Sequence, residues 1–242
     1  MNTPKSRRAA SKMRNGAIVA RGFTLLELAV VISIIFLILG SVTIGRDVHR
    51  NAAYQRISSD FIQGWLIAYD AYVAGTGIVP GDSATAPTGL ISGVTATSLC
   101  GAPLMNAMQA AGVAMPAGRA EGANERYVYL DSNGIPHELQ VCLRNVSWAE
   151  PSVTVGTYVA RNRNVLEIRG MTPALAKLID NQIDGLPDAR FGKMREVSQS
   201  AIITAGLGVP WSEDDTTNFN KTKTNEDETQ VVEVLGYIKM SR

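Results

Sequence analysis

Histidine and cysteine are scarce in this chain of 242 residues, which contains only two of each. The sequence has no His-Glu-x-x-His zinc motif, no Gly-x-Ser-x-Gly nucleophile motif and no phosphate-binding Gly-rich loop. It also lacks the Cys-x-x-Cys pattern of metal and redox sites. His49 follows an apolar run directly and is expected to lie at a membrane interface, while His137 lies beside a predicted strand. These absences argue against an enzyme, and an anchored periplasmic enzyme is kept only as a rival hypothesis.

Charge is missing from a long stretch near the N-terminus. Residues 28–45 contain no charged side chain, and residues 1–22 contain six basic residues but no acidic one. A helix of about 20 apolar residues is long enough to cross the hydrocarbon core of a bilayer, so residues 23–45 are expected to span a membrane. The positive-inside rule then places residues 1–22 in the cytoplasm and the rest of the chain outside it.

One carboxylate, Glu27, lies at the start of this apolar run. Moving an acidic side chain into hydrocarbon costs about 2.5–3.5 kcal/mol on insertion scales, so such a residue is a candidate for function. Its natural partner is a cation. A plain membrane anchor with an accidental acid at the interface is the alternative interpretation.

The stretch Gly22-Phe23-Thr24-Leu25-Leu26-Glu27-Leu28 resembles the processing motif of type IV prepilins and of the pseudopilins of type II secretion. The resemblance implies that prepilin peptidase cuts after Gly22 and N-methylates Phe23. It also implies that Glu27 is the assembly residue, which pairs with the amino terminus of a neighbouring subunit. Because Glu27 is four residues from Phe23, an ion pair between Glu27 and the amine of Phe23 within one helix is a second alternative.

The resemblance further implies a structural subunit of a type IV pilus or type II secretion pseudopilus, somewhat favouring a minor pilin. Its expected location is the bacterial inner membrane, crossed once with the head in the periplasm, and then the filament. Its expected partners are prepilin peptidase, other pilin or pseudopilin subunits, the inner membrane and the assembly platform. The alternative is a binding module at the filament tip for adhesion or DNA uptake. The sequence leaves open which machine the subunit serves and whether it is a major or minor subunit.

The charge balance gives no support to bulk nucleic-acid binding. Removing the leader leaves 17 basic against 22 acidic residues, a net charge near −5. Arg161, Arg163 and Arg169 could form a small basic patch, but charges this sparse are more often part of a solvated face.

The two cysteines, Cys100 and Cys142, both fall in the part expected outside the cytoplasm, where disulfides persist. We expect them to be paired. Closing a loop of about 42 residues stabilises a fold by about 4 kcal/mol in the chain-entropy treatment. The C-terminal disulfide of many type IV pilins frames a surface loop, whereas this pair lies in the middle of the head.

The expected fold is α+β and pilin-like, with a long N-terminal hydrophobic α-helix packed on an antiparallel sheet. The helix is predicted over residues 23–75, with residues 46–75 amphipathic, and the head over residues 76–242. No proline occurs between Phe23 and Val79. The residues assigned to the apolar stripe of the second half of this helix are Val48, Ala52, Ile57, Phe61, Trp65, Leu66, Tyr69 and Tyr72.

Turn and cap signals divide the head into further elements. A turn is expected at residues 80–82, a short helix at 100–111, a hairpin around Asp131-Ser132-Asn133-Gly134, and a helix from Thr172-Pro173 to Gly185. The strands are predicted at residues 127–130, 138–143, 153–160, 165–168 and 231–238.

Two groups of acidic residues are candidate ligands for a cation. Asp180 and Asp184 share a helix face, although paired acids on an exposed face are usually only solvated. Acidic residues of the polar C-terminal segment could hold calcium, which the major pseudopilins bind in a C-terminal loop, but no EF-hand spacing is present. The favoured interpretation is a loop with no metal and no cofactor. These acids are Glu213, Asp214, Asp215, Glu226, Asp227 and Glu228.

Overall fold

The computed structural model describes residues 24–120, 123–216 and 230–241; for residues 41–47 it describes the backbone alone. The chain divides after Gly45 into two units, and the second contains every strand that the structure describes. The second unit is α+β, with helices packed on an antiparallel sheet, as the sequence predicts.

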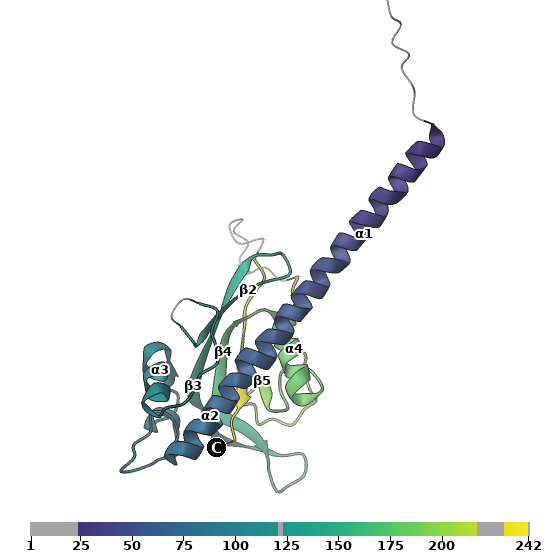
Figure 1. Ribbon diagram of the computed structural model, residues 1–242. Coiled ribbons are helices and arrows are strands. Elements are labelled where there is room, and N and C mark those ends of the chain that lie inside the picture. The colour runs from purple at the N-terminus through teal and green to yellow at the C-terminus, as the bar shows by residue number, and fades with distance from the viewer. Residues whose placement is uncertain (1–23, 121–122, 217–229, 242) are drawn as a thin grey trace, which may run out of the picture. The chain divides into compact units, whose positions relative to one another are not determined.

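Three consecutive helical segments form the N-terminal part of the described chain (Figure 1). These are α1 (Leu25–Arg56), the π-helix η1 (Ile57–Ile62) and α2 (Gln63–Thr76). Helix α2 ends because Gly77 adopts a left-handed conformation, with φ of 78°, and donates its N–H to the Val73 carbonyl. The expected turn follows: the amide of Asp82 bonds to the carbonyl of Val79 across Pro80 and Gly81.

Within the described residues the sheet contains six strands, and every pair of strands is antiparallel. Five strands follow the order β1-β3-β4-β6-β5, and β2 also pairs with β3. The strands are β1 (Ser98–Cys100), β2 (Arg126–Leu130), β3 (Pro136–Pro151), β4 (Tyr158–Met171), β5 (Met194–Glu196) and β6 (Val234–Lys239).

The strand predictions were correct for the hairpin of β2 and β3 but wrong for residues 153–157. Residues 152–157 connect β3 to β4, because Pro151 pairs with Tyr158 and the six residues between them form the turn. Val153 and Val155 at this turn are fully exposed, with relative exposures of 102% and 99%. The alternation of apolar and polar residues that predicted a strand there therefore does not place the valines on a buried face of the sheet. The last strand, predicted from residue 231, begins at Val234.

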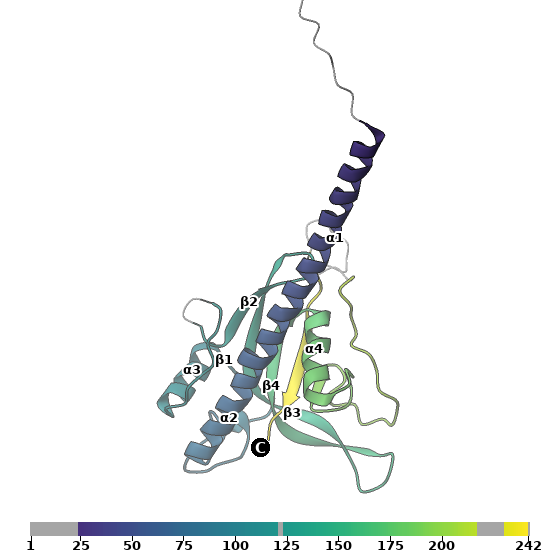
Figure 2. The ribbon, with the colours of Figure 1, turned by 45° about the vertical axis from the view of Figure 1, so that its right-hand side comes forward.

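Three shorter helices complete the described part of the head: η2 (Ile91–Gly93), α3 (Gly101–Ala110) and α4 (Pro173–Asp184). Helices α3 and α4 lie on either side of α2 in both Figure 1 and Figure 2. The expected helix after Thr172 is confirmed, with Pro173 in its first turn and Gly185 at its C-terminal cap. The Thr172 side chain does not cap it. Instead, Asp215 accepts a hydrogen bond of 2.8 Å from the amide of Ala174.

The main core lies between the helical segment and the sheet, and it contains the aromatic stripe that the sequence predicts. Fully buried helix residues include Phe61, Trp65 and Tyr69, which pack with residues of β3 and β4. Val48 and Ala52, also assigned to the stripe, are exposed. The step of five residues from Ala52 to Ile57 rotates a helix by about 140° beyond a full turn, so the two residues lie off the buried face.

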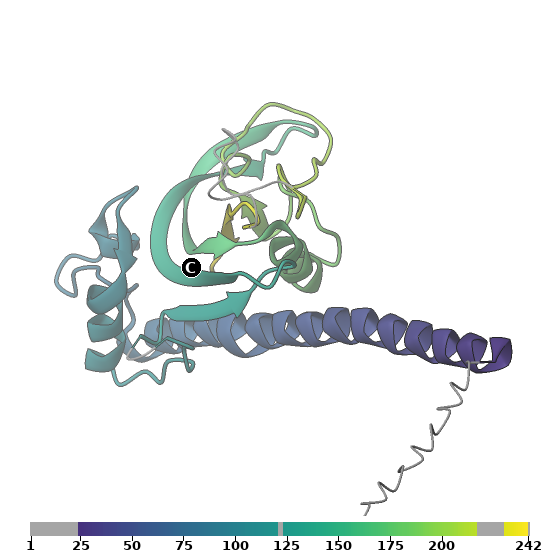
Figure 3. The ribbon, with the colours of Figure 1, turned by 90° about the horizontal axis from the view of Figure 1, so that it is seen from above.

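Strands β3 and β4 are long and strongly curved (Figure 3). Alternate residues of β3 point to opposite faces of the sheet. Val141 and Leu143 belong to the core beside the helix, whereas Trp148 belongs to a second cluster with Val165 and Tyr237. The sheet therefore has a second face, turned away from the main core.

Candidate functional site

The first turn of α1 carries the acid that the sequence singles out. The amide of Glu27 donates a hydrogen bond of 3.2 Å to the Thr24 hydroxyl, which caps the start of the helix. Thr24 and Glu27 have the Ser/Thr-x-x-Glu spacing of a capping box, and an acid in the first turn also interacts favourably with the helix dipole. The Glu27 side chain is exposed.

The apolar residues on both sides of Glu27 in the sequence are exposed all around the helix. Every residue from 24 to 40 is exposed, and Leu25, Phe36 and Leu37 have relative exposures of 87%, 69% and 72%. Exposed apolar surface of this extent marks a site of contact with a protein or a membrane. This segment is the candidate assembly surface, defined here as residues 24–40.

The proposed processing site lies outside the described residues, as do Gly22, Phe23 and the basic leader. The described helices include none with both the length and the apolar character needed to cross a membrane. Of the expected span, residue 23 and the side chains of residues 41–45 fall outside the description. The membrane span stays a prediction.

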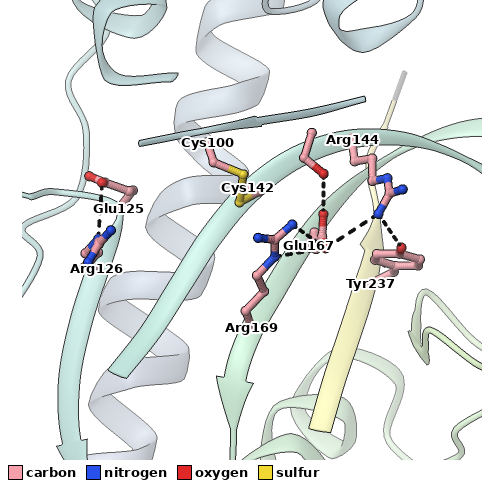
Figure 4. The surroundings of a disulfide bond; sticks show 9 residues. Cys100, Glu125, Arg126, Cys142, Arg144, Glu167, Arg169 and Tyr237 are labelled. Carbon is pink, nitrogen blue, oxygen red and sulfur yellow. Dashed lines mark hydrogen bonds and ion pairs between the residues drawn. A yellow bond between two sulfur atoms is a disulfide. The ribbon is translucent and has the colours of Figure 1, made fainter. Parts of the chain in front are cut away.

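The expected disulfide is confirmed. Cys100 and Cys142 are bonded, with an S–S distance of 2.01 Å and a Cα–Cα distance of 4.5 Å. They are directly paired residues of β1 and β3, so the bond fastens a strand of three residues to the long strand β3 (Figure 4).

The three arginines considered for a basic patch instead face acids on neighbouring positions of the sheet, and their side chains are 41–62% exposed, as favoured for a solvated face. Arg163 forms two hydrogen bonds with Glu150, at 2.8 and 2.7 Å, and this pairing lowers the pKa of Glu150 to about 2. Arg161 lies 3.9 Å from the same carboxylate. Arg169 pairs with the buried Glu167 at 3.0 Å.

His137 is part of a buried cluster that the sequence did not predict. Its Nε2 lies 3.0 Å from Asp131 Oδ2, and its Nδ1 lies 3.1 Å from Glu233 Oε1. Burial disfavours the charged ring, but these two hydrogen bonds outweigh it and raise the pKa of His137. Asp131 also accepts the amide of Val231 at 3.2 Å. The cluster therefore ties the turn between β2 and β3 to the segment before β6.

Asp180 and Asp184 were expected on an exposed face, and this expectation is wrong for Asp180. Its side chain is fully buried, and Asp180 Oδ2 accepts hydrogen bonds from Trp211 Nε1 at 2.9 Å and from the amide of Asp188 at 2.8 Å. Its second oxygen accepts no hydrogen bond within geometric limits from any residue that the structure describes. Burial raises the pKa of Asp180 to about 7, and the neighbouring Asp184 adds to the rise.

Asp184 has a different role from that of a cation ligand. Its two oxygens accept hydrogen bonds from the amides of Lys193 and Met194, at 3.0 and 2.9 Å. Together the two aspartates hold the turn after α4 and the segment of Trp211 against the helix. Their function in this structure is therefore to fix loops.

No group of three metal-ligating side chains occurs among the described residues. In the acidic segment, Asp214 accepts a hydrogen bond from the amide of Thr216, and Asp215 caps α4. Glu226, Asp227 and Glu228 lie outside the described residues, so the calcium hypothesis for them stays open.

Comparisons with models of protein families, with curated proteins and with solved structures find no match to this chain.

Proposed function

We propose that the chain is a pilin-like structural subunit, anchored in the bacterial inner membrane and assembled into a type IV pilus or a type II secretion pseudopilus. The observation that carries the proposal is the assembly surface: an apolar helical segment, exposed on all sides, with a single acid in its first turn. It is supported by the α+β head with a disulfide, which suits a domain outside the cytoplasm.

In this proposal, prepilin peptidase cuts after Gly22 and leaves a positively charged amine on Phe23. In the filament, Glu27 of one subunit pairs with that amine of a neighbour. Two opposite charges attract more strongly in an apolar environment than in water, although desolvation offsets much of the gain. The pair would therefore mainly fix the register between neighbouring subunits. The apolar residues would leave their contacts with lipid and pack against other helices in the filament core.

The first test is intact-mass measurement and N-terminal sequencing of the protein from cells with and without prepilin peptidase. A peptidase-dependent chain beginning at N-methylated Phe23 is expected. A chain beginning at Met1 in both strains would refute the pathway and leave a simple membrane anchor.

A pair of variants separates the charge of Glu27 from its place in the capping box. Glu27→Gln keeps a residue that suits the capping box but removes the charge, so we expect normal processing and poor incorporation into sheared filaments. Thr24→Val removes the capping hydroxyl at a cost of about 1 kcal/mol and keeps the charge, so incorporation should persist. Normal incorporation of Glu27→Gln would refute the proposed charge pair.

A further inference from the structure

The second face of the sheet contains a hollow of about 450 Å³. Its floor comes from β3, β4 and β6, and its rim from residues 95–96 and 197–201. Among the described residues that line it, Arg144 is the only charged one, and Ser147, Asn162 and Ser200 contribute neutral polar groups. Pockets of roughly 300–1,000 Å³ are typical of small-ligand sites.

The nearest acid to Arg144 is Glu167, but other donors already occupy that carboxylate. Glu167 accepts hydrogen bonds from Arg169, at 3.1 and 3.0 Å, and from the Ser98 hydroxyl at 2.9 Å. Arg144 Nη1 lies 3.8 Å from Glu167, which is beyond hydrogen-bond distance (Figure 4). The guanidinium groups of Arg144 and Arg169 thus both lie near the Glu167 carboxylate, but only Arg169 is close enough to form hydrogen bonds with it.

The remaining contacts of Arg144 are weak. Its Nη1 donates a long hydrogen bond of 3.4 Å to the Tyr237 hydroxyl, and its buried Nε has no acceptor within the described part of the chain. A buried donor without an acceptor costs about 1–3 kcal/mol, and more when the group is charged. Because Nε is buried, an anion that enters the hollow would reach the guanidinium at its terminal nitrogens, where Nη1 has only the long contacts to Tyr237 and Glu167.

We propose that this hollow is a binding site for a carboxylate group, with Arg144 as its principal donor. A carboxylate matches the planar fork of a guanidinium, and each hydrogen bond to a charged partner contributes about 1.5–3 kcal/mol. The volume admits a small organic acid or a single acidic residue of a peptide, and the two sources share this chemistry. The proposal does not depend on assembly into a filament.

The test uses the full chain in detergent micelles, with methyl-labelled valine followed by NMR, because Val146 and Val197 line the hollow. Three probes are titrated: acetate, a capped tripeptide with a central glutamate, and the same tripeptide with glutamine. Saturable shifts at both valines with the glutamate peptide, but not with the glutamine peptide, are expected. Binding of acetate as well would identify a free carboxylate as sufficient. Equal binding of both peptides, or no saturation by any probe, would overturn the proposal.

Variants then test the role of Arg144. Arg144→Gln should weaken binding at least about tenfold, and Arg144→Lys should weaken it less because the charge remains while the fork is lost. Arg126→Gln is the matched control, since Arg126 is an exposed arginine of the same sheet, paired with Glu138 at 2.8 Å. Unchanged affinity in Arg144→Gln would refute the assignment. If Arg144→Gln fails to fold, the affinity of Arg144→Lys and the comparison of the glutamate and glutamine peptides still test the role of Arg144.

Discussion

Asp180→Asn should remove a pH-dependent loss of stability from the head. Asp180 is buried beside Trp211, and burial raises its pKa from the ordinary value of 3.8 to about 7. The folded protein therefore binds this proton more tightly than the unfolded chain does. A raised pKa contributes stability that is fully present below about pH 4 and is lost as the pH rises to about 7.

The size of the effect follows from the two pKa values. Each pKa unit corresponds to about 1.36 kcal/mol, so a rise from 3.8 to about 7 corresponds to at most about 4 kcal/mol above pH 7. Asparagine has no proton to lose, and its oxygen can still accept from Trp211 and from the amide of Asp188. The variant should match the native protein near pH 4 and exceed it by up to about 4 kcal/mol near pH 8.

The assay is urea unfolding of the full chain in detergent at several pH values between about 4 and 8, with free energies from linear extrapolation. Asp60→Asn is the control, because it makes the same substitution at an exposed carboxyl of the helical run that contains the core residues. The indole Nε1–H signal of Trp211, identified with Trp211→Phe, should titrate near pH 7 in the native protein. Parallel stability profiles for Asp180→Asn and the native chain would refute the reasoning.

Four further changes test other parts of the fold. Replacing Cys100 and Cys142 together by serine should lower the free energy of unfolding by about 4 kcal/mol, as measured by denaturant unfolding against the native protein with its disulfide intact. Trp65→Ala should cost about 3–5 kcal/mol in the same assay, because the side chain is fully buried in the main core. The raised pKa of His137 contributes stability that is fully present below pH 6.5 and is lost as the pH rises through the pKa of His137 in the folded protein. His137→Gln should therefore remove this decline of stability with rising pH, and Glu233→Gln should make the decline smaller.

Local patterns in the sequence predict the elements of this fold well. The cap and turn residues around Pro173 and Gly185 predict α4, and the Asp131–Gly134 turn predicts the hairpin of β2 and β3. The compartment expected for the head predicts the disulfide. Each of these predictions depends on neighbours within a few residues or on composition, which the sequence states directly.

Contacts between distant residues could not be predicted in the same way. Glu233 is 96 residues from His137, and Trp211 is 31 residues from Asp180, so no spacing rule connects them. For Asp180 one signal was present: it lies four residues after Ala176, which is buried, and directly after the buried Ile179. That position belongs to the apolar face of α4, and an acid there is expected to be buried with a partner.

Asp180 and Glu27 look alike in the sequence, since each is an acid among apolar residues of a helix, but the structure treats them differently. Asp180 finds its donors within its own chain, from Trp211 and the amide of Asp188. Glu27 forms no ion pair with any residue that the structure describes, and its amide, rather than its carboxylate, bonds to Thr24. Asp180 is therefore held by hydrogen bonds within its own chain, whereas Glu27 lies next to an exposed apolar surface and has no ion pair among the described residues; in the proposed function, its cation is the amine of a neighbouring subunit. This difference is the reason to seek the partner of Glu27, and not that of Asp180, in another subunit.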